Sequence, residues 1–142
     1  MKENRECYQN RELSWLLFNE RVLNEAANPR VPLMERLQFV SIYQTNLDEF
    51  FMVRVGTLMQ QMENKTVKDN KMGLSSKEQI KLILKEVARL EQKRKEIYTQ
   101  LMGELEPVGI HIINFQKLSK QEQNQLEAYF DKAIRPYLSP MI

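Results

Sequence analysis

The sequence has too few cysteine, histidine and glycine residues for several common kinds of functional site. Its 142 residues include one cysteine, Cys7, which excludes an internal disulfide framework and suits a reducing compartment. One histidine and one cysteine cannot form a zinc site. The four glycines are too scattered for a phosphate-cradling loop, and no local motif suggests Ser-His-Asp chemistry. We therefore expect neither a catalytic residue nor a metal ligand in this chain.

Long apolar runs and a strong charge of one sign are also missing. No run of about 18 apolar residues is present, so we expect no transmembrane helix. The first residues are polar and include acids, unlike a signal peptide. These features predict a cytoplasmic protein, free or peripherally attached to a membrane. The net charge of +2 is too small to indicate nucleic acid as a partner.

The small positive charge is concentrated in the middle of the chain. Residues 64–106 carry 10 basic and 7 acidic side chains, with the excess between Lys65 and Lys85. Intermixed charges of this kind usually form the solvated face of a helix. A surface that faces a polyanion is the alternative interpretation.

Apolar residues at helical spacing predict a mainly α fold, with an antiparallel helical bundle over residues 1–107. Pro107 is expected to stop the last helix of this bundle. Residues 63–75 lack periodicity and are expected to form a loop. Four helix starts are predicted, at Ser14, Pro32, Asn46 and Ser75.

The segment Asn46-Leu47-Asp48-Glu49 has the pattern of a capping box before an apolar run. The pattern predicts that Asn46 caps a helix and that Gln44-Thr45 precedes it as a break. Asp48 and Glu49 would then lie in the first turn, where the helix dipole favours negative charge. An ordinary capped helix explains these residues, and a ligand with acceptor groups at the helix start is the functional alternative.

The composition changes after Pro107. Residues 109–115 are predicted to form one short strand, and a capping box at Ser119 is predicted to start another helix. A single strand cannot satisfy its own backbone groups. We therefore expect residues 108–142 to open a second domain and the natural polypeptide to continue. His111 lies inside this apolar stretch and is expected to be a structural histidine or one at the rim of the core.

Two blocks of residues together give the chain a family likeness. The first is Glu12-Leu13-Ser14-Trp15-Leu16 with Phe18-Asn19-Glu20-Arg21-Val22-Leu23, and the second is Pro32-Leu33 with Asn46-Leu47-Asp48-Glu49-Phe50 and Val53-Arg54. The sequence resembles the N-terminal domain of bacterial polyphosphate kinase of the phosphohistidine type. The resemblance is dense over about residues 8–62 and weaker beyond.

The resemblance implies an enzyme of several hundred residues that transfers the terminal phosphate of ATP to polyphosphate, reversibly and with Mg²⁺. It implies further domains of the same chain and a homo-oligomer formed through a head domain that begins at residues 108–142. The family's phosphorylated histidine belongs to a later domain and does not match His111. This fragment alone is therefore expected to be inactive.

The resemblance also implies one site residue, because the family's nucleotide-contacting asparagine matches Asn46. If its Oδ1 caps a helix, only its NH2 group remains to bind the adenine base of ATP or ADP, as a donor. The alternative to this enzymatic function is a non-enzymatic helical module whose apolar residues 108–142 bind a partner chain. A polyanion-binding surface between Lys65 and Lys85 is a third option.

Overall fold

The computed structural model describes residues 10–63 and 73–139. Contacts within the chain divide it into two compact units, Met1–Val108 and Gly109–Ile142. The mainly α fold class is confirmed. The helical elements of the first unit are α1 (Arg11–Ala27), α2 (Leu33–Phe50), the π turn η2 (Phe51–Val55), α3 (Gly56–Glu63), α4 (Ser76–Leu105) and the 3-10 turn η3 (Glu106–Val108).

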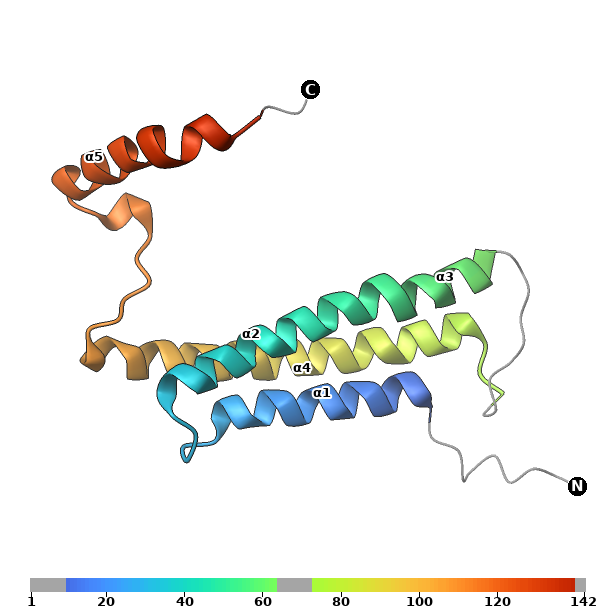
Figure 1. The fold of residues 1–142 in the computed structure, drawn as a ribbon. Coiled ribbons are helices and arrows are strands. Elements are labelled where there is room, and N and C mark those ends of the chain that lie inside the picture. The colour runs from blue at the N-terminus through green and yellow to red at the C-terminus, as the bar shows by residue number, and fades with distance from the viewer. Residues whose placement is uncertain (1–9, 64–72, 140–142) are drawn as a thin grey trace, which may run out of the picture. The chain divides into compact units, whose positions relative to one another are not determined.

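Helices α1, α2 and α4 lie side by side, with α2 running antiparallel to the other two (Figure 1). Each helix buries one apolar stripe in a shared core. Residues from all three helices are fully buried there, among them Leu16, Leu23, Tyr43, Ile83 and Leu90. Burying each of these large apolar side chains contributes roughly 1.5–3 kcal/mol. The core therefore holds the antiparallel bundle together.

Helix α1 starts earlier than the sequence predicted. Its N-cap is Asn10, whose side chain accepts hydrogen bonds from the backbone N–H groups of Glu12 and Leu13 at 2.9 and 3.1 Å. The expected start at Ser14 is wrong because Asn10 already satisfies the free donors of the first turn. The expected end at Asn28-Pro29 is confirmed.

The buried face of α1 is partly polar. Phe18 is 47% exposed, whereas Asn19 is fully buried. The buried positions of the helix are Glu12, Leu16, Asn19, Leu23 and Ala26. Their spacing is helical, but Glu12 and Asn19 are polar. A search of the sequence for apolar residues at helical spacing therefore does not identify these two as buried.

Helices α2 and α3 follow one another through η2 without a loop, so the expected break at Gln44-Thr45 is wrong. Neither glycine nor proline lies between Leu33 and Val55 to end the helix. The irregularity falls at η2, where the Gly56 N–H donates to the Phe51 carbonyl, five residues back. The buried residues Phe50 and Val55 are also five apart, so the π turn keeps both side chains in the core.

Helix α4 begins and ends as the sequence predicted. The Ser75 hydroxyl accepts from the Glu78 N–H at 3.3 Å, and the Glu78 carboxylate accepts from the Ser75 N–H at 2.9 Å. This reciprocal capping box confirms the predicted start. The helix ends at Leu105, two residues before Pro107. Most of the loop expected over residues 63–75 lies outside the described residues.

The second unit contains helical elements but no strand among its described residues. These elements are η4 (Phe115–Lys117), α5 (Lys120–Tyr129), the π turn η5 (Phe130–Ile134) and the 3-10 turn η6 (Arg135–Tyr137). The predicted strand over residues 109–115 is wrong: residues 110–114 have no regular structure. No neighbouring strand is available in the described part of the chain to complete their hydrogen bonds. The capping box at Ser119 is confirmed.

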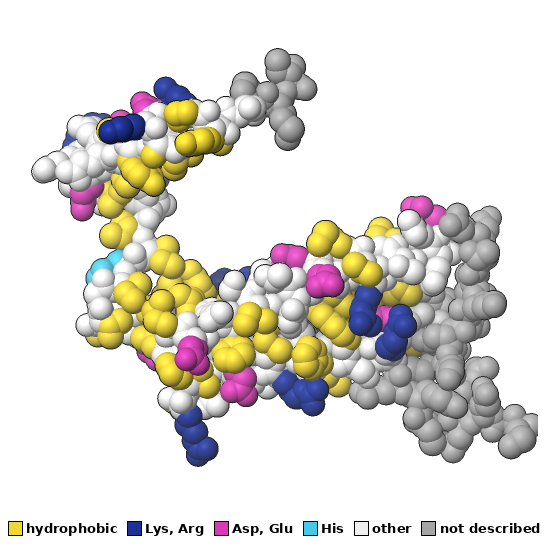
Figure 2. Space-filling model, viewed as in Figure 1, with side chains coloured by type: hydrophobic (Ala, Val, Ile, Leu, Met, Phe, Trp, Pro, Cys, Tyr) yellow, Lys and Arg dark blue, Asp and Glu magenta, His cyan; other side chains and the backbone are white. Residues whose placement is uncertain are grey.

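Apolar side chains of the second unit lie at its surface. No described residue between Gly109 and Ser139 is buried. Hydrophobic side chains are visible along the α5 segment in Figure 2. The most exposed of the large ones are Ile112, Tyr129 and Tyr137, at 71%, 61% and 86%.

Candidate functional site

The residue singled out by the sequence, Asn46, lies inside α2 and caps no helix. Its amide nitrogen donates to the side-chain oxygen of Asn19 on α1, at 3.0 Å. Within a continuous helix, the backbone N–H groups that follow Asn46 already bond to carbonyls one turn back, so none is left for its side chain. The capping role expected for Asn46 is therefore wrong, and one of the two N–H donors of its amide is already used by Asn19.

Asn19 fixes the orientation of this contact. It is fully buried, and its amide nitrogen donates to the backbone carbonyl of Tyr43 at 3.1 Å. A carbonyl can only accept, so the Asn19 nitrogen must face Tyr43 and its oxygen must face Asn46. The Asn46 nitrogen donates to the Asn19 oxygen. The Asn46 oxygen therefore has no hydrogen-bond partner among the described residues. The half-buried Asn46 thus offers an acceptor.

Asp48 and Glu49 lie near the C-terminal end of α2, contrary to the expected first turn. The favourable dipole interaction predicted for them does not arise, because the positive end of a helix is its start. Both side chains are exposed, and Asp48 accepts from Gln44 Nε2 at 3.0 Å.

An aromatic stack lies one turn from Asn46. Phe50 stacks on Trp15 of α1, with ring centroids 4.5 Å apart and an interplanar angle of 11°. The Arg54 guanidinium lies over the Trp15 ring, 5.8 Å from its centroid. It also pairs with the buried Glu12 carboxylate at 3.2 Å. The stack and the ion pair join α1 to α2 and η2, and so fix the helices that carry Asn19 and Asn46.

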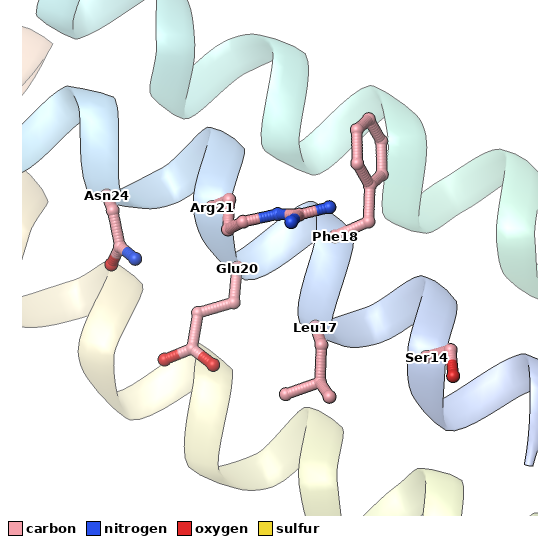
Figure 3. Close-up of a pocket in the computed structure, with 6 residues that line it drawn as sticks. All are labelled: Ser14, Leu17, Phe18, Glu20, Arg21 and Asn24. Atoms are coloured by element: carbon pink, nitrogen blue, oxygen red, sulfur yellow. The ribbon is translucent and has the colours of Figure 1, made fainter. Parts of the chain in front are cut away.

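A groove of about 470 Å³ lies along α1. Figure 3 shows the side chains that line it. Its lining residues are Ser14, Leu17, Phe18, Glu20, Arg21 and Asn24. The Arg21 side chain points toward Phe18, and its guanidinium lies 5.8 Å from the ring centroid. Glu20 points instead toward α4, where Arg89 and Lys93 bind it at 2.6 and 2.7 Å.

Two ionisable groups between the helices, Glu20 and Tyr43, have pKa values that are shifted away from neutral pH. Hydrogen bonds from Arg89 and Lys93 lower the pKa of Glu20 to about 2. Burial, reinforced by the nearby Glu91 carboxylate, raises the pKa of Tyr43 well above its ordinary value. The Tyr43 hydroxyl donates to Glu91 at 3.4 Å. Neither Glu20 nor Tyr43 is tuned for proton transfer near neutral pH.

The described residues do not gather a set of metal ligands. No group of three or more His, Cys, Asp or Glu side chains lies together among residues 10–63 and 73–139. His111 is exposed, so its expected structural role is not supported by burial.

Sequence analysis missed Asn19, the residue that sets the orientation of Asn46. A signal was present, because Asn19 stands at a core position between Leu16 and Leu23 in the helical spacing. A buried polar side chain at such a position needs a partner. The partner itself could not be read from the sequence, since it lies 27 residues away on the next helix.

The fold and this contact define a mainly helical domain in which a half-buried side-chain amide is held in one orientation. A family model described as "Polyphosphate kinase N-terminal domain" matches residues 8–113. The chain belongs to this family. None of the helices in the described part combines the length and the apolar character needed to cross a bilayer.

Curated relatives agree with the family match. Polyphosphate kinase of Halalkalibacterium halodurans is 46% identical over 138 residues, and that of Bacillus cereus is 44% identical over 136 residues. Polyphosphate kinase of Synechocystis sp. is 42% identical over 135 residues. Each alignment covers 94% of this chain and 18–19% of the relative. The chain therefore spans about a fifth of the length of these relatives.

Proposed function

We propose that this chain is the N-terminal part of a polyphosphate kinase, which transfers phosphate between ATP and polyphosphate with Mg²⁺. Within it, Asn46 contributes to the side of the ATP site that holds the base. The family match and the names of the relatives support the activity. The observation that carries the role of Asn46 is its half-buried side chain, held by Asn19 with one acceptor directed away from that contact.

The activity is tested with the full-length protein and with residues 1–142 alone. Phosphate transfer from ATP to polyphosphate is expected for the full-length protein and absent for the shorter chain, because the described residues supply no group suited to the chemistry. Turnover of ATP by residues 1–142 would overturn the proposal that the reaction depends on further domains.

The role of Asn46 is tested by Asn46→Ala in the full-length protein. One neutral hydrogen bond is worth about 0.5–1.5 kcal/mol, so the KM for ATP should rise roughly two- to tenfold. Asn24→Ala is the matched control, because Asn24 is an exposed asparagine on α1. Equal KM values for the two variants would remove Asn46 from the nucleotide site.

The second unit supports an accompanying proposal about partners. Residues 108–142 would be the start of a second domain, whose exposed apolar side chains pack against the remaining domains of the same polypeptide and support a homo-oligomer. The same exposure favours the alternative function, a helical module that binds another protein chain. The sequence beyond Ile142 distinguishes the two functions. A phosphorylatable histidine there, among arginines, would favour the kinase over the protein-binding module.

The polyanion-binding option rests on part of the basic segment. Lys77, Lys81 and Lys85 are exposed on α4, whereas Lys65, Lys68 and Lys71 lie outside the described residues. Residues spaced by four share one face of a helix, so these three charges form a row. Salt-dependent retention of polyphosphate by the chain would support this contact, and its loss in a triple Lys→Gln variant would locate it.

A further inference from the structure

We propose that Asn19 is a positioning residue that makes the nucleotide site selective for adenine over guanine. It does so by holding the Asn46 amide with its oxygen outward. The inference rests on the proposed role of Asn46 in binding the base, and it adds a specific cause for the choice of base. Asn19 itself touches no substrate, because its side chain is fully buried.

Neither amide can be turned over without bringing two acceptor oxygens into contact. Turning the Asn46 amide would bring its oxygen against the Asn19 oxygen, across a contact of 3.0 Å. Turning Asn19 as well would bring its oxygen against the Tyr43 carbonyl, across 3.1 Å. That carbonyl belongs to the backbone of α2 and cannot turn. Water cannot relieve either clash, because Asn19 is fully buried.

The Asn46 oxygen, an acceptor, can form a hydrogen bond with adenine but would repel the O6 acceptor of guanine. Adenine carries an amine donor on the edge where guanine carries the O6 acceptor. The Asn46 oxygen accepts from that amine, and the second N–H of its amide is available to a ring nitrogen beside it. Guanine would bring its O6 against the Asn46 oxygen. An asparagine free to turn would instead offer its NH2 group to O6 and bind both bases.

The experiment compares base preference in variants of the full-length protein. Its readout is the ratio of kcat/KM for ATP to kcat/KM for GTP, with purine riboside triphosphate, which lacks the amine, as a third substrate. Asn19→Leu keeps the size of the side chain but removes its hydrogen bonds, so the Asn46 amide can turn. The ATP:GTP ratio is expected to fall about tenfold, within the range that one oriented amide contributes to discrimination between bases.

Asn19→Asp provides a second variant with the opposite expectation. A carboxyl buried in this position is neutral, because burial disfavours the charged form. It can donate O–H to the Tyr43 carbonyl and accept from Asn46 with its other oxygen, so the ATP:GTP ratio should be retained. Asn24→Leu, at an exposed position of α1, is the matched control and should also keep the ratio. Thermal melting of each variant separates loss of folding from loss of selectivity.

The outcomes distinguish this inference from the proposed function. If Asn46→Ala leaves the KM for ATP unchanged, the base-binding role fails, and the inference fails with it. If Asn46→Ala raises that KM but folded Asn19→Leu and Asn19→Asp keep the same ATP:GTP ratio, only the positioning role of Asn19 is refuted. Should Asn19→Leu fail to fold, loss of the ratio in folded Asn19→Asp would refute the inference. Equal use of ATP and purine riboside triphosphate by the unmodified protein would also refute it.

Discussion

The buried arginine at the start of α2 allows a stability effect to be worked out from the structure. The Arg36 side chain is 6% exposed, and its Nε donates to the Ala26 carbonyl at 2.9 Å. Ala26 lies in the last turn of α1, where carbonyls have no partner within the helix. The guanidinium also binds the Glu104 carboxylate on α4 through two contacts, at 2.5 and 3.2 Å. Arg36 therefore joins three helices at one end of the bundle.

Arg36→Met keeps the length of the side chain and removes every donor. Replacing a buried charge by an apolar group can be neutral when both partners are replaced together. Here the Ala26 carbonyl stays buried without a partner, which costs about 1–3 kcal/mol. The lost interaction of the cation with the end of the α1 dipole adds about 0.3–1 kcal/mol. We expect unfolding to become easier by about 2–3 kcal/mol in total.

The assay is thermal unfolding of the 142-residue chain, followed by far-UV circular dichroism. For a chain of this size, 1 kcal/mol corresponds to about 3–4 °C, so the Tm should fall by roughly 6–12 °C. Arg30→Met is the matched control, because Arg30 is exposed in the turn between α1 and α2. A Tm within two or so degrees of that control would refute the reasoning, since the carbonyl would then have found another partner.

Two further predictions concern pH and capping. The pKa of Glu20 is lowered to about 2, so its contribution to stability is present above pH 4.5 and lost as the pH falls toward 2. Glu20→Gln should flatten the dependence of Tm on pH over this window, and an unchanged dependence would contradict the ion pair with Arg89 and Lys93. Ser75→Ala removes the cap of α4 and should cost about 1 kcal/mol in urea unfolding. Ser75→Asp, which keeps an acceptor, should retain stability, and equal losses in both variants would exclude the cap.

Local signals in the sequence predicted the helices, because each depends on residues close together in the chain. The boxes at Ser75 and Ser119 lie within four residues, and Pro107 acts on its own helix. The capping box at Asn46 failed for the opposite reason. Its pattern is local, but the backbone donors that it would satisfy are already used by a helix that began at Leu33.

The geometry of the candidate site could not be predicted, because it depends on contacts between residues far apart in the sequence. The resemblance singled out Asn46, but the direction of its amide follows from Asn19 and from the Tyr43 carbonyl on the facing side of the helix pair. The Asn46 oxygen, which was expected to cap a helix, has no partner among the described residues for that reason. The strand expected over residues 109–115 shows the same limit, since a strand forms only when a neighbour provides hydrogen bonds.

The π turn η2 behaves as an extra residue accommodated in a helix that would otherwise be regular. Everything C-terminal to Phe51 is rotated by the angle of one residue relative to a continuous α-helix. Arg54 owes its position beside Trp15 and Glu12 to this rotation. Deleting one residue from η2 would leave α2 in place and rotate α3 about the helix axis. The π turn thus sets the direction of the downstream half, which packs on α4, separately from that of the upstream half.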